Sequence, residues 1–261
     1  MQTARYFYCH GLPGSEREVD FLSPEHTSGE RLFCLDRMSR GREHLGWEQR
    51  ALDAFDQARG RATDQPVRLI GFSLGAMTAI HLAARRPEAI ESVHLISPAA
   101  PLELGDFLSR MAGRAVFQAA RHDGPAIGLL SRAQSMMLGV APGLLIRALF
   151  ADATASERQL IEDRGFQDAL RHGLGQSLGP YRLAYEEELR AYVRPWADRL
   201  DAVRCPVTLW HGAEDTWAPS DMSDRLAQRL PGPASVTRLS GLGHFGTLRQ
   251  ALPIILDNAL A

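Results

Sequence analysis

Residues 67–85 read VRLIGFSLGAMTAIHLAAR. The stretch opens with an apolar run, 67–72, typical of a buried β-strand, and continues with small apolar residues typical of a buried helix that ends before Pro87. Between the two lies Gly71-Phe72-Ser73-Leu74-Gly75, a G-x-S-x-G pattern at a strand-to-helix junction. A sharp turn at such a junction projects the serine hydroxyl above the end of the strand. The sequence therefore predicts that Ser73 is a catalytic nucleophile.

A nucleophilic serine needs a general base and a carboxylate that orients this base. His244 lies in a glycine-containing loop after the last strand-like run, and we expect it to be the base. Asp215 follows the preceding strand-like run and is the expected acid. The chain order serine, acid, histidine is one of the orders known for such triads. Glu214 and Glu103 remain alternative acids at this stage.

Hydrogen-bond donors are also needed where the negative charge of a tetrahedral intermediate develops. The backbone amide of Leu74, directly after the serine, is one expected donor. The loop 10–15 after the first strand-like run supplies the other, and the Leu12 amide is the expected group. His10 and His211 each precede a glycine at a strand end, and we interpret them as hydrogen bonders that fix their loops.

The wider chain alternates strand-like runs with helical patterns, which indicates parallel βα units and an α/β fold with a central, mostly parallel sheet. The predicted strands are 5–9, 31–35, 67–72, 92–97, 206–211 and 234–239. One helix is expected over 45–58, with Gly60 as its stop signal.

Strand signals stop between Pro98 and about Pro195. Apolar spacing predicts one helix over 103–121, a capping box at 154–157 opens another, and 181–193 predicts a last one. We therefore expect an α/β core of residues 1–99 and 196–261, with an all-helical cap inserted at residues 100–195.

Composition excludes several classes of function. The chain has 261 residues, and all 29 of its basic residues are arginine. Without lysine it has no Schiff-base, pyridoxal-phosphate or P-loop chemistry. A net charge of −2 with dispersed arginines gives no basic patch for nucleic acid.

Nothing in the sequence indicates export, a membrane span, a metal ion or another cofactor. The N-terminus lacks a secretory pattern, and the most apolar stretch is too short to cross a bilayer. Cys9, Cys34 and Cys205 are interpreted as three buried thiols, and the histidines lack metal-ligand spacing. We expect a cytoplasmic protein without a metal or cofactor. The oligomeric state is left open.

Four motifs together resemble the α/β-hydrolase fold superfamily, in its cap-containing, esterase- and lipase-like branch. They are H-G-x-P-G-S at 10–15, G-F-S-L-G at 71–75, H-G-x-E-D at 211–215 and G-x-G-H-F at 241–245. The resemblance implies a Ser–His–Asp hydrolase with a helical cap. The chain departs from the family by starting at the strand before the first motif, so the usual first two strands are expected to be missing.

The expected reaction is hydrolysis of an ester or thioester of a small to medium apolar acyl group through an acyl-enzyme. A serine at position 73 argues against the dehalogenases and epoxide hydrolases of the superfamily, which use a carboxylate there. Trp217, Phe245, Met136 and Met137 are candidate substrate-binding residues. Three alternatives remain: a C–C bond hydrolase, an acyltransferase or thioesterase for carrier-bound acyl groups, and a non-enzymatic ligand sensor.

Overall fold

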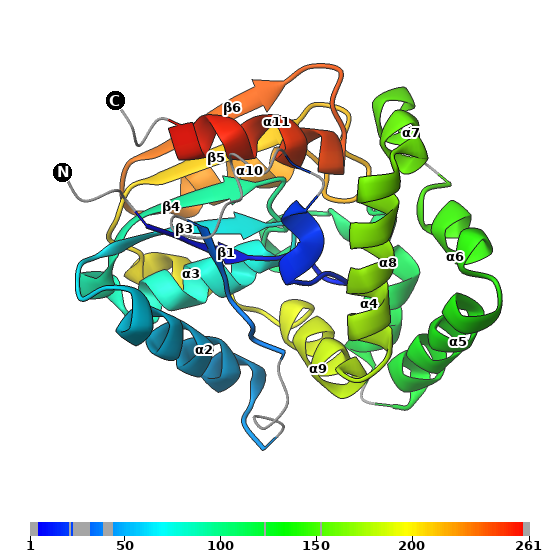
Figure 1. Cartoon of the computed structure of the whole chain (residues 1–261). Coiled ribbons are helices and arrows are strands. Elements are labelled where there is room, and N and C mark those ends of the chain that lie inside the picture. The colour runs from blue at the N-terminus through cyan, green and yellow to red at the C-terminus, as the bar shows by residue number, and fades with distance from the viewer. Residues whose placement is uncertain are drawn as a thin grey trace.

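The centre of the molecule is a sheet of six parallel strands in the order β2-β1-β3-β4-β5-β6 (Figure 1). The computed structural model describes residues 5–20, 22, 32–38, 44–122, 124–151 and 153–257. The strands are β1 (Tyr6–Cys9), β2 (Leu32–Cys34), β3 (Val67–Phe72), β4 (Ile90–Ile96), β5 (Val207–Gly212) and β6 (Ala234–Leu239). Every predicted strand forms within two residues of its expected bounds, which confirms the α/β class.

Helices cover both faces of this sheet. Helices α2 (Trp47–Ala62) and α3 (Gly75–Arg85) lie on one face, and α11 (His244–Asp257) lies on the other (Figure 1). Helix α10 (Asp221–Arg229) connects β5 to β6. Ala76 and Ala79 in α3 are fully buried. Their small side chains let this helix lie close against β3 and β4.

Between β4 and β5 all the described secondary structure is helical. The elements are the short 3₁₀ turns η3 (Leu102–Leu104) and η4 (Leu108–Arg110), then α4 (Arg114–Arg121), α5 (Ala126–Val140), α6 (Pro142–Leu149), α7 (Ala155–Glu162), α8 (Arg164–Leu178) and α9 (Arg182–Tyr192). In Figure 1 these helices, coloured green to yellow, stand beyond the ends to which the strand arrows point. We refer to residues 100–195 as the helical insertion.

Two helix predictions are wrong in detail. The single helix expected over 103–121 is instead two 3₁₀ turns followed by α4, because Gly105 adopts an extended conformation and Gly113 caps the new helix. Glycine is a poor residue for a helix interior. The stop expected at Gly60 also fails, since α2 continues to Ala62. Gly60 is exposed with nothing near it, so it costs only about 1 kcal/mol within the helix.

Three further elements complete the core: η1 (Glu16–Val19), η2 (Pro87–Ala89) and η5 (Ala197–Ala202). From Arg5 onward the described residues contain no strand before β1. Of the three cysteines, all free, only Cys9 is fully buried, while Cys34 and Cys205 are half-buried, so the prediction of three buried thiols is correct for one. Among the described helices, none has the length and hydropathy needed to cross a membrane.

Candidate active site

Ser73 occupies a strained turn between β3 and α3. Its φ of 55° lies in the left-handed region, which side chains other than glycine rarely adopt. The glycines on either side make the turn possible: a Cβ at Gly75 would lie 2.0 Å from the carbonyl oxygen of Cys9, and one at Gly71 would lie 2.9 Å from the Cα of Ala76. The G-x-S-x-G pattern is therefore required by close backbone packing around the serine.

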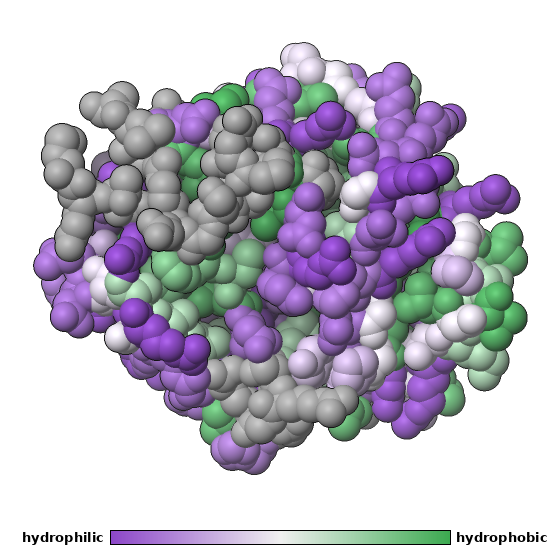
Figure 2. Space-filling view, viewed as in Figure 1, coloured by the Kyte–Doolittle hydropathy of each residue, from purple (hydrophilic) through white to green (hydrophobic). Residues whose placement is uncertain are grey.

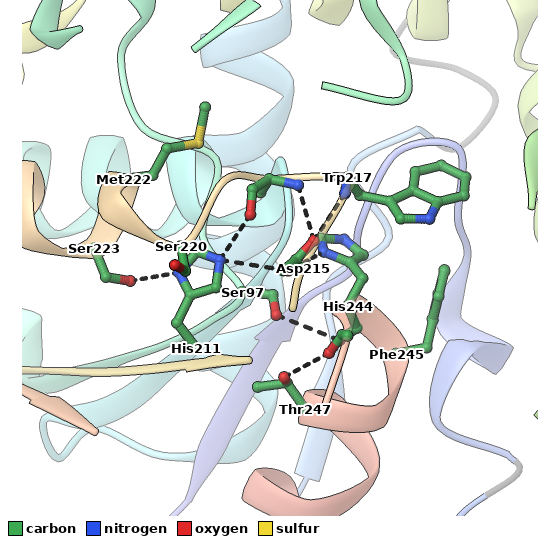
Figure 3. A network of polar contacts seen from close by, with 12 residues as sticks. Ser97, His211, Asp215, Trp217, Ser220, Met222, Ser223, His244, Phe245 and Thr247 are labelled. Atoms are coloured by element: carbon green, nitrogen blue, oxygen red, sulfur yellow. Dashed lines mark hydrogen bonds and ion pairs between the residues drawn. The ribbon is translucent and has the colours of Figure 1, made fainter. Parts of the chain in front are cut away.

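His244 and Asp215 form a buried pair beside this turn. The imidazole Nδ1 of His244 lies 2.7 Å from Oδ2 of Asp215, and both side chains are almost completely inaccessible (Figure 3). The other carboxylate oxygen, Oδ1, accepts hydrogen bonds from the backbone amides of Trp217 and Ala218 at 2.8 and 2.9 Å. The His244 ring lies 4.8 Å from the ring of Phe72, which directly precedes the serine.

The pair is arranged to hold opposite charges. Burial alone would raise the pKa of Asp215, but the charge of His244 and hydrogen bonds from His211 and His244 outweigh it, so the carboxyl pKa lies far below its ordinary value. Burial alone would lower the pKa of His244, yet the negative charge of Asp215, followed by Glu157 and Glu18, raises it. This environment favours an imidazole that accepts a proton during a reaction.

A second layer of hydrogen bonds fixes the loops that carry the pair (Figure 3). His211 Nε2 lies 2.9 Å from the carbonyl of Ala218 and 3.3 Å from Asp215, consistent with the interpretation of His211 as a loop-fixing residue. The hydroxyl of Ser97, which has a φ of 44°, donates to the carbonyl of His244 at 3.3 Å. The sequence analysis missed Ser97, although it stands directly after β4 at the same edge of the sheet.

The buried carboxylate of Glu18 binds the backbone of the loop after β1. Oε2 of Glu18 accepts hydrogen bonds from the Gly11 amide and the Tyr8 hydroxyl, each at 2.8 Å. Within the described residues, neither the Leu12 nor the Leu74 amide donates a hydrogen bond to another protein group. Both predicted donors therefore lack a protein acceptor among the described residues. The sequence analysis missed Glu18, which carries no motif of its own.

A narrow cavity of about 60 Å³ opens beside Ser73. Leu12, Leu74 and Trp217 line it from the core side. Apolar residues of the helical insertion form the opposite wall: Met111, Val116, Phe117, Leu145, Leu149, Leu174, Leu178 and Leu189. A smaller adjoining cavity contains Ser73, His244, Trp217 and Phe245 in its wall. The structure thus brings the predicted nucleophile, base and two of the four candidate substrate-binding residues around one space.

Met136 and Met137 are the exception, and the expectation that they line the substrate cavity is wrong. They are 72% and 43% exposed, on the outer face of α5, and are not in the wall of either cavity. Leu129 and Val140 of α5 and Leu144 of α6 are exposed as well, and Figure 2 shows apolar surface at the right of the view. Hydropathy alone does not tell which face of such a helix points inward.

The alternative acids lie elsewhere. Glu214 is exposed, and Glu103 accepts hydrogen bonds from the amides of Trp196 and Ala197.

Glu157, a residue of the predicted capping box, is fully buried and accepts a hydrogen bond from the Phe245 amide at 3.0 Å. In the part of the chain that the structure describes, no three His, Cys, Asp or Glu side chains are grouped to hold a metal ion.

A comparison with known protein families agrees with the α/β fold described above. The family model described as "alpha/beta hydrolase fold" matches residues 7–249. The chain belongs to the alpha/beta hydrolase fold family.

The individual relatives and solved structures described next are at most 28% identical to this chain. The chain is 28% identical over 239 residues to the pimeloyl-[acyl-carrier protein] methyl ester esterase of Neisseria meningitidis serogroup B, covering 87% of this chain and 81% of that protein. It is 28% identical over 170 residues to the protein of the same name from Chromobacterium violaceum, covering 64% of this chain and 58% of the other.

Two solved structures show the same fold. An N-acyl homoserine lactone degrading enzyme superposes with a TM-score of 0.65 at 14% identity, covering 98% of this chain and 93% of the other. The structure of MenH from S. aureus superposes with a TM-score of 0.62 at 16% identity, covering 100% and 94%. At these identities the likeness concerns the fold alone.

Proposed function

We propose that this protein is a serine esterase that hydrolyses an ester of an apolar acyl group through an acyl-enzyme. The observation that carries the proposal is the convergence at one cavity of Ser73 on its strained turn and His244 bound to a buried Asp215. A serine nucleophile, a base and an orienting acid are the three groups that hydrolyse acyl compounds through an acyl-enzyme.

In the proposed mechanism the Ser73 hydroxyl attacks the ester carbonyl while His244 takes its proton. Asp215 holds the imidazole in the required tautomer and stabilises the imidazolium. The amides of Leu12 and Leu74 donate to the oxyanion of the tetrahedral intermediate. His244 then protonates the leaving alcohol, and a water molecule deacylates Ser73 by the same steps.

The substrate class follows from the wall of the cavity. Leucine, valine and phenylalanine side chains make up most of the insertion's part of the wall, beside Gln134 and Tyr185, and this supports a substrate whose acyl or alkyl part is apolar. We propose that residues 100–195 act as a cap over the core of residues 1–99 and 196–261. The names of the two bacterial relatives favour, as the finer proposal, a methyl ester on a carrier-bound acyl chain.

The second candidate is a thioesterase or acyltransferase that acts on a carrier-bound acyl group, since the same relatives' names contain such a group. A C–C bond hydrolase uses the same three residues and is separated only by its substrate. A panel of methyl esters, acyl thioesters and vinylogous diketones distinguishes these activities by which bond is cleaved. A ligand sensor would cleave none of them.

The nucleophile is tested with a fluorophosphonate probe. We expect labelling of the wild type and none of Ser73→Ala, and we expect Ser73→Ala and His244→Ala each to lower kcat/KM for an ester by about 10⁴-fold or more. The double variant should lose little more than either single one, because the residues act as a unit. A folded wild type that resists the probe would contradict the proposal.

The pocket is tested with p-nitrophenyl esters from acetate to octanoate. We expect kcat/KM to change at least tenfold along the series, because the apolar wall binds the chain and its length is limited. Equal values from acetate to octanoate would show that the insertion does not select the acyl group.

A further inference from the structure

A carboxylate of the helical insertion is buried against the backbone that carries the catalytic base. Glu157 lies in the first turn of α7, whose N-terminus is capped by the Thr154 hydroxyl. The side chain does not reach back to its own helix end as in a capping box. It crosses to the core, where Oε1 accepts a hydrogen bond from the Phe245 amide at 3.0 Å. The residue is 0% exposed.

The core is shaped to receive this carboxylate. A Cβ at Gly243 would lie 2.6 Å from Cδ of Glu157 and 2.7 and 2.9 Å from its two oxygens. Every side chain larger than hydrogen at position 243 would therefore displace the carboxylate. Gly243 precedes His244 in the G-x-G-H-F motif, so the glycine provides the space through which the insertion contacts the catalytic loop.

The cost of burying this carboxylate needs an explanation. Among the described residues, Oε2 of Glu157 is buried without a hydrogen-bond partner. Burial, together with the like charge of Asp215, raises the pKa of Glu157 above its ordinary value, although the charge of His244 and the Phe245 amide act in the opposite direction. The positive end of α11, a helix of 14 residues that starts at His244, also favours a negative charge here.

The charged groups that face His244 come from three separate elements. Asp215 follows β5, Glu157 belongs to α7, and Glu18 belongs to η1, while His211 contacts the same Asp215 carboxylate. The neutral rings of Phe72 and Trp217 pack on the remaining sides. Only Glu157 among these groups comes from the helical insertion. The insertion therefore contributes one of the negative charges that raise the pKa of His244.

We propose that Glu157 is a positioning residue through which the helical insertion sets the position and the basicity of the catalytic base. Its carboxylate accepts the hydrogen bond of the Phe245 amide in the first turn of α11 and stabilises the imidazolium form of His244 beside Asp215. This inference rests on the proposed function, because it assigns His244 as the base. Glu157 does not contact substrate; it sets the position and the basicity of the group that does.

The test compares Glu157→Gln, which keeps the acceptor oxygen but removes the charge, with Glu162→Gln, an exposed residue on the same helix. The rate of fluorophosphonate labelling of Ser73 and kcat/KM for an ester are measured from pH 5 to 9. The base acts in its neutral form, so the acid limb should move to lower pH in Glu157→Gln by at least half a pH unit. Because the imidazolium is less stabilised, kcat at the plateau should fall about tenfold. Glu162→Gln should match the wild type.

Gly243→Ala provides a second, independent variant, since its methyl group displaces the carboxylate without changing Glu157. It should show the same shift of the acid limb. Thermal unfolding and circular dichroism establish that each variant is folded at the assay temperature. If both variants fold and their pH profiles superimpose on that of the wild type, Glu157 has only a structural role and the proposal is wrong. Failure of the wild type to react with the probe would instead overturn the proposed function.

Discussion

The residues around Ser73 show how single side chains determine this site. Ser73 and Ser97 both have positive φ, and both stand directly after strands at the carboxyl edge of the sheet. One supplies the proposed nucleophile, and the other holds the backbone of His244. The energy stored in such turns, of order 1–3 kcal/mol each, is sustained by the packing around them.

Glu18 gives a prediction at the same scale. Burial raises the pKa of this carboxyl from an ordinary 4.5 to about 7, although the Gly11 amide and the Tyr8 hydroxyl act in the opposite direction. Because the pKa is raised in the folded state, its contribution to stability is complete below pH 4.5 and is lost as pH rises through 7. Glutamine imitates the protonated form. We therefore expect Glu18→Gln to gain stability relative to the wild type between pH 5 and pH 8.

Urea denaturation at these two pH values measures the effect. A difference in the free energy of unfolding between variant and wild type that does not change with pH would show that Glu18 titrates normally. Glu16, on the same 3₁₀ turn but 58% exposed in its side chain, provides the control as Glu16→Gln.

At the scale of the elements, two consecutive helices of the insertion differ in what they carry. The Thr154 hydroxyl caps α7 by accepting from the Glu157 amide, and the Asp163 carboxylate caps α8 by accepting from the Phe166 amide. Helix α7 holds Glu157 against the base, whereas α8 contributes Leu174 and Leu178 to the cavity wall. The N-caps of α7 and α8 can therefore be compared directly, because the two helices contribute different residues to the candidate site.

We expect Thr154→Ala and Asp163→Ala each to lower stability by about 1 kcal/mol through loss of an N-cap. Only Thr154→Ala should also move the acid limb of the pH profile toward lower pH, since α7 no longer holds Glu157 firmly. Chemical denaturation and the pH dependence of kcat/KM measure the two effects. Equal pH shifts in both variants would show that the insertion acts on His244 as a whole and not through α7.

Across the whole molecule, a buried ion pair joins the core to the helical insertion. Arg37, after β2, contacts Glu188 of α9 at 2.9 Å, and both side chains are 2–3% exposed. The same guanidinium donates to the carbonyl of His10, at the start of the loop that supplies the Leu12 amide. The insertion is thereby tied to the loop after β1 as well as, through Glu157, to the backbone beside His244.

Glu188→Gln should lower the free energy of unfolding by about 3–5 kcal/mol, because it leaves the Arg37 charge buried without its partner. The double variant Arg37→Met, Glu188→Leu should recover most of this loss by replacing the pair with apolar packing. Asp221→Asn, which breaks the exposed pair with Arg110, should cost less than about 1 kcal/mol. Urea denaturation of the wild type and the three variants measures these differences in the free energy of unfolding. A double variant as unstable as Glu188→Gln would contradict the prediction.

The sequence by itself determined the strands and the class of fold, and it predicted Ser73, His244 and Asp215 as site residues, with Glu214 and Glu103 as alternative acids. These features depend on local rules: strand periodicity, glycines that permit one sharp turn, and the order in which parallel strands deliver their loops to one edge. The same rules failed over 103–121, where apolar spacing fitted a helix but Gly105 and Gly113 divided it.

Only the tertiary structure decided which carboxylates surround the base and which face of the insertion lines the cavity. Glu157 and Phe245 are 88 positions apart, and Met136 and Met137 share their hydropathy with residues that are buried. Which face of a helix is buried depends on what packs against it, and no local pattern contains that information. The coupling between insertion and base therefore becomes visible only once the chain is folded.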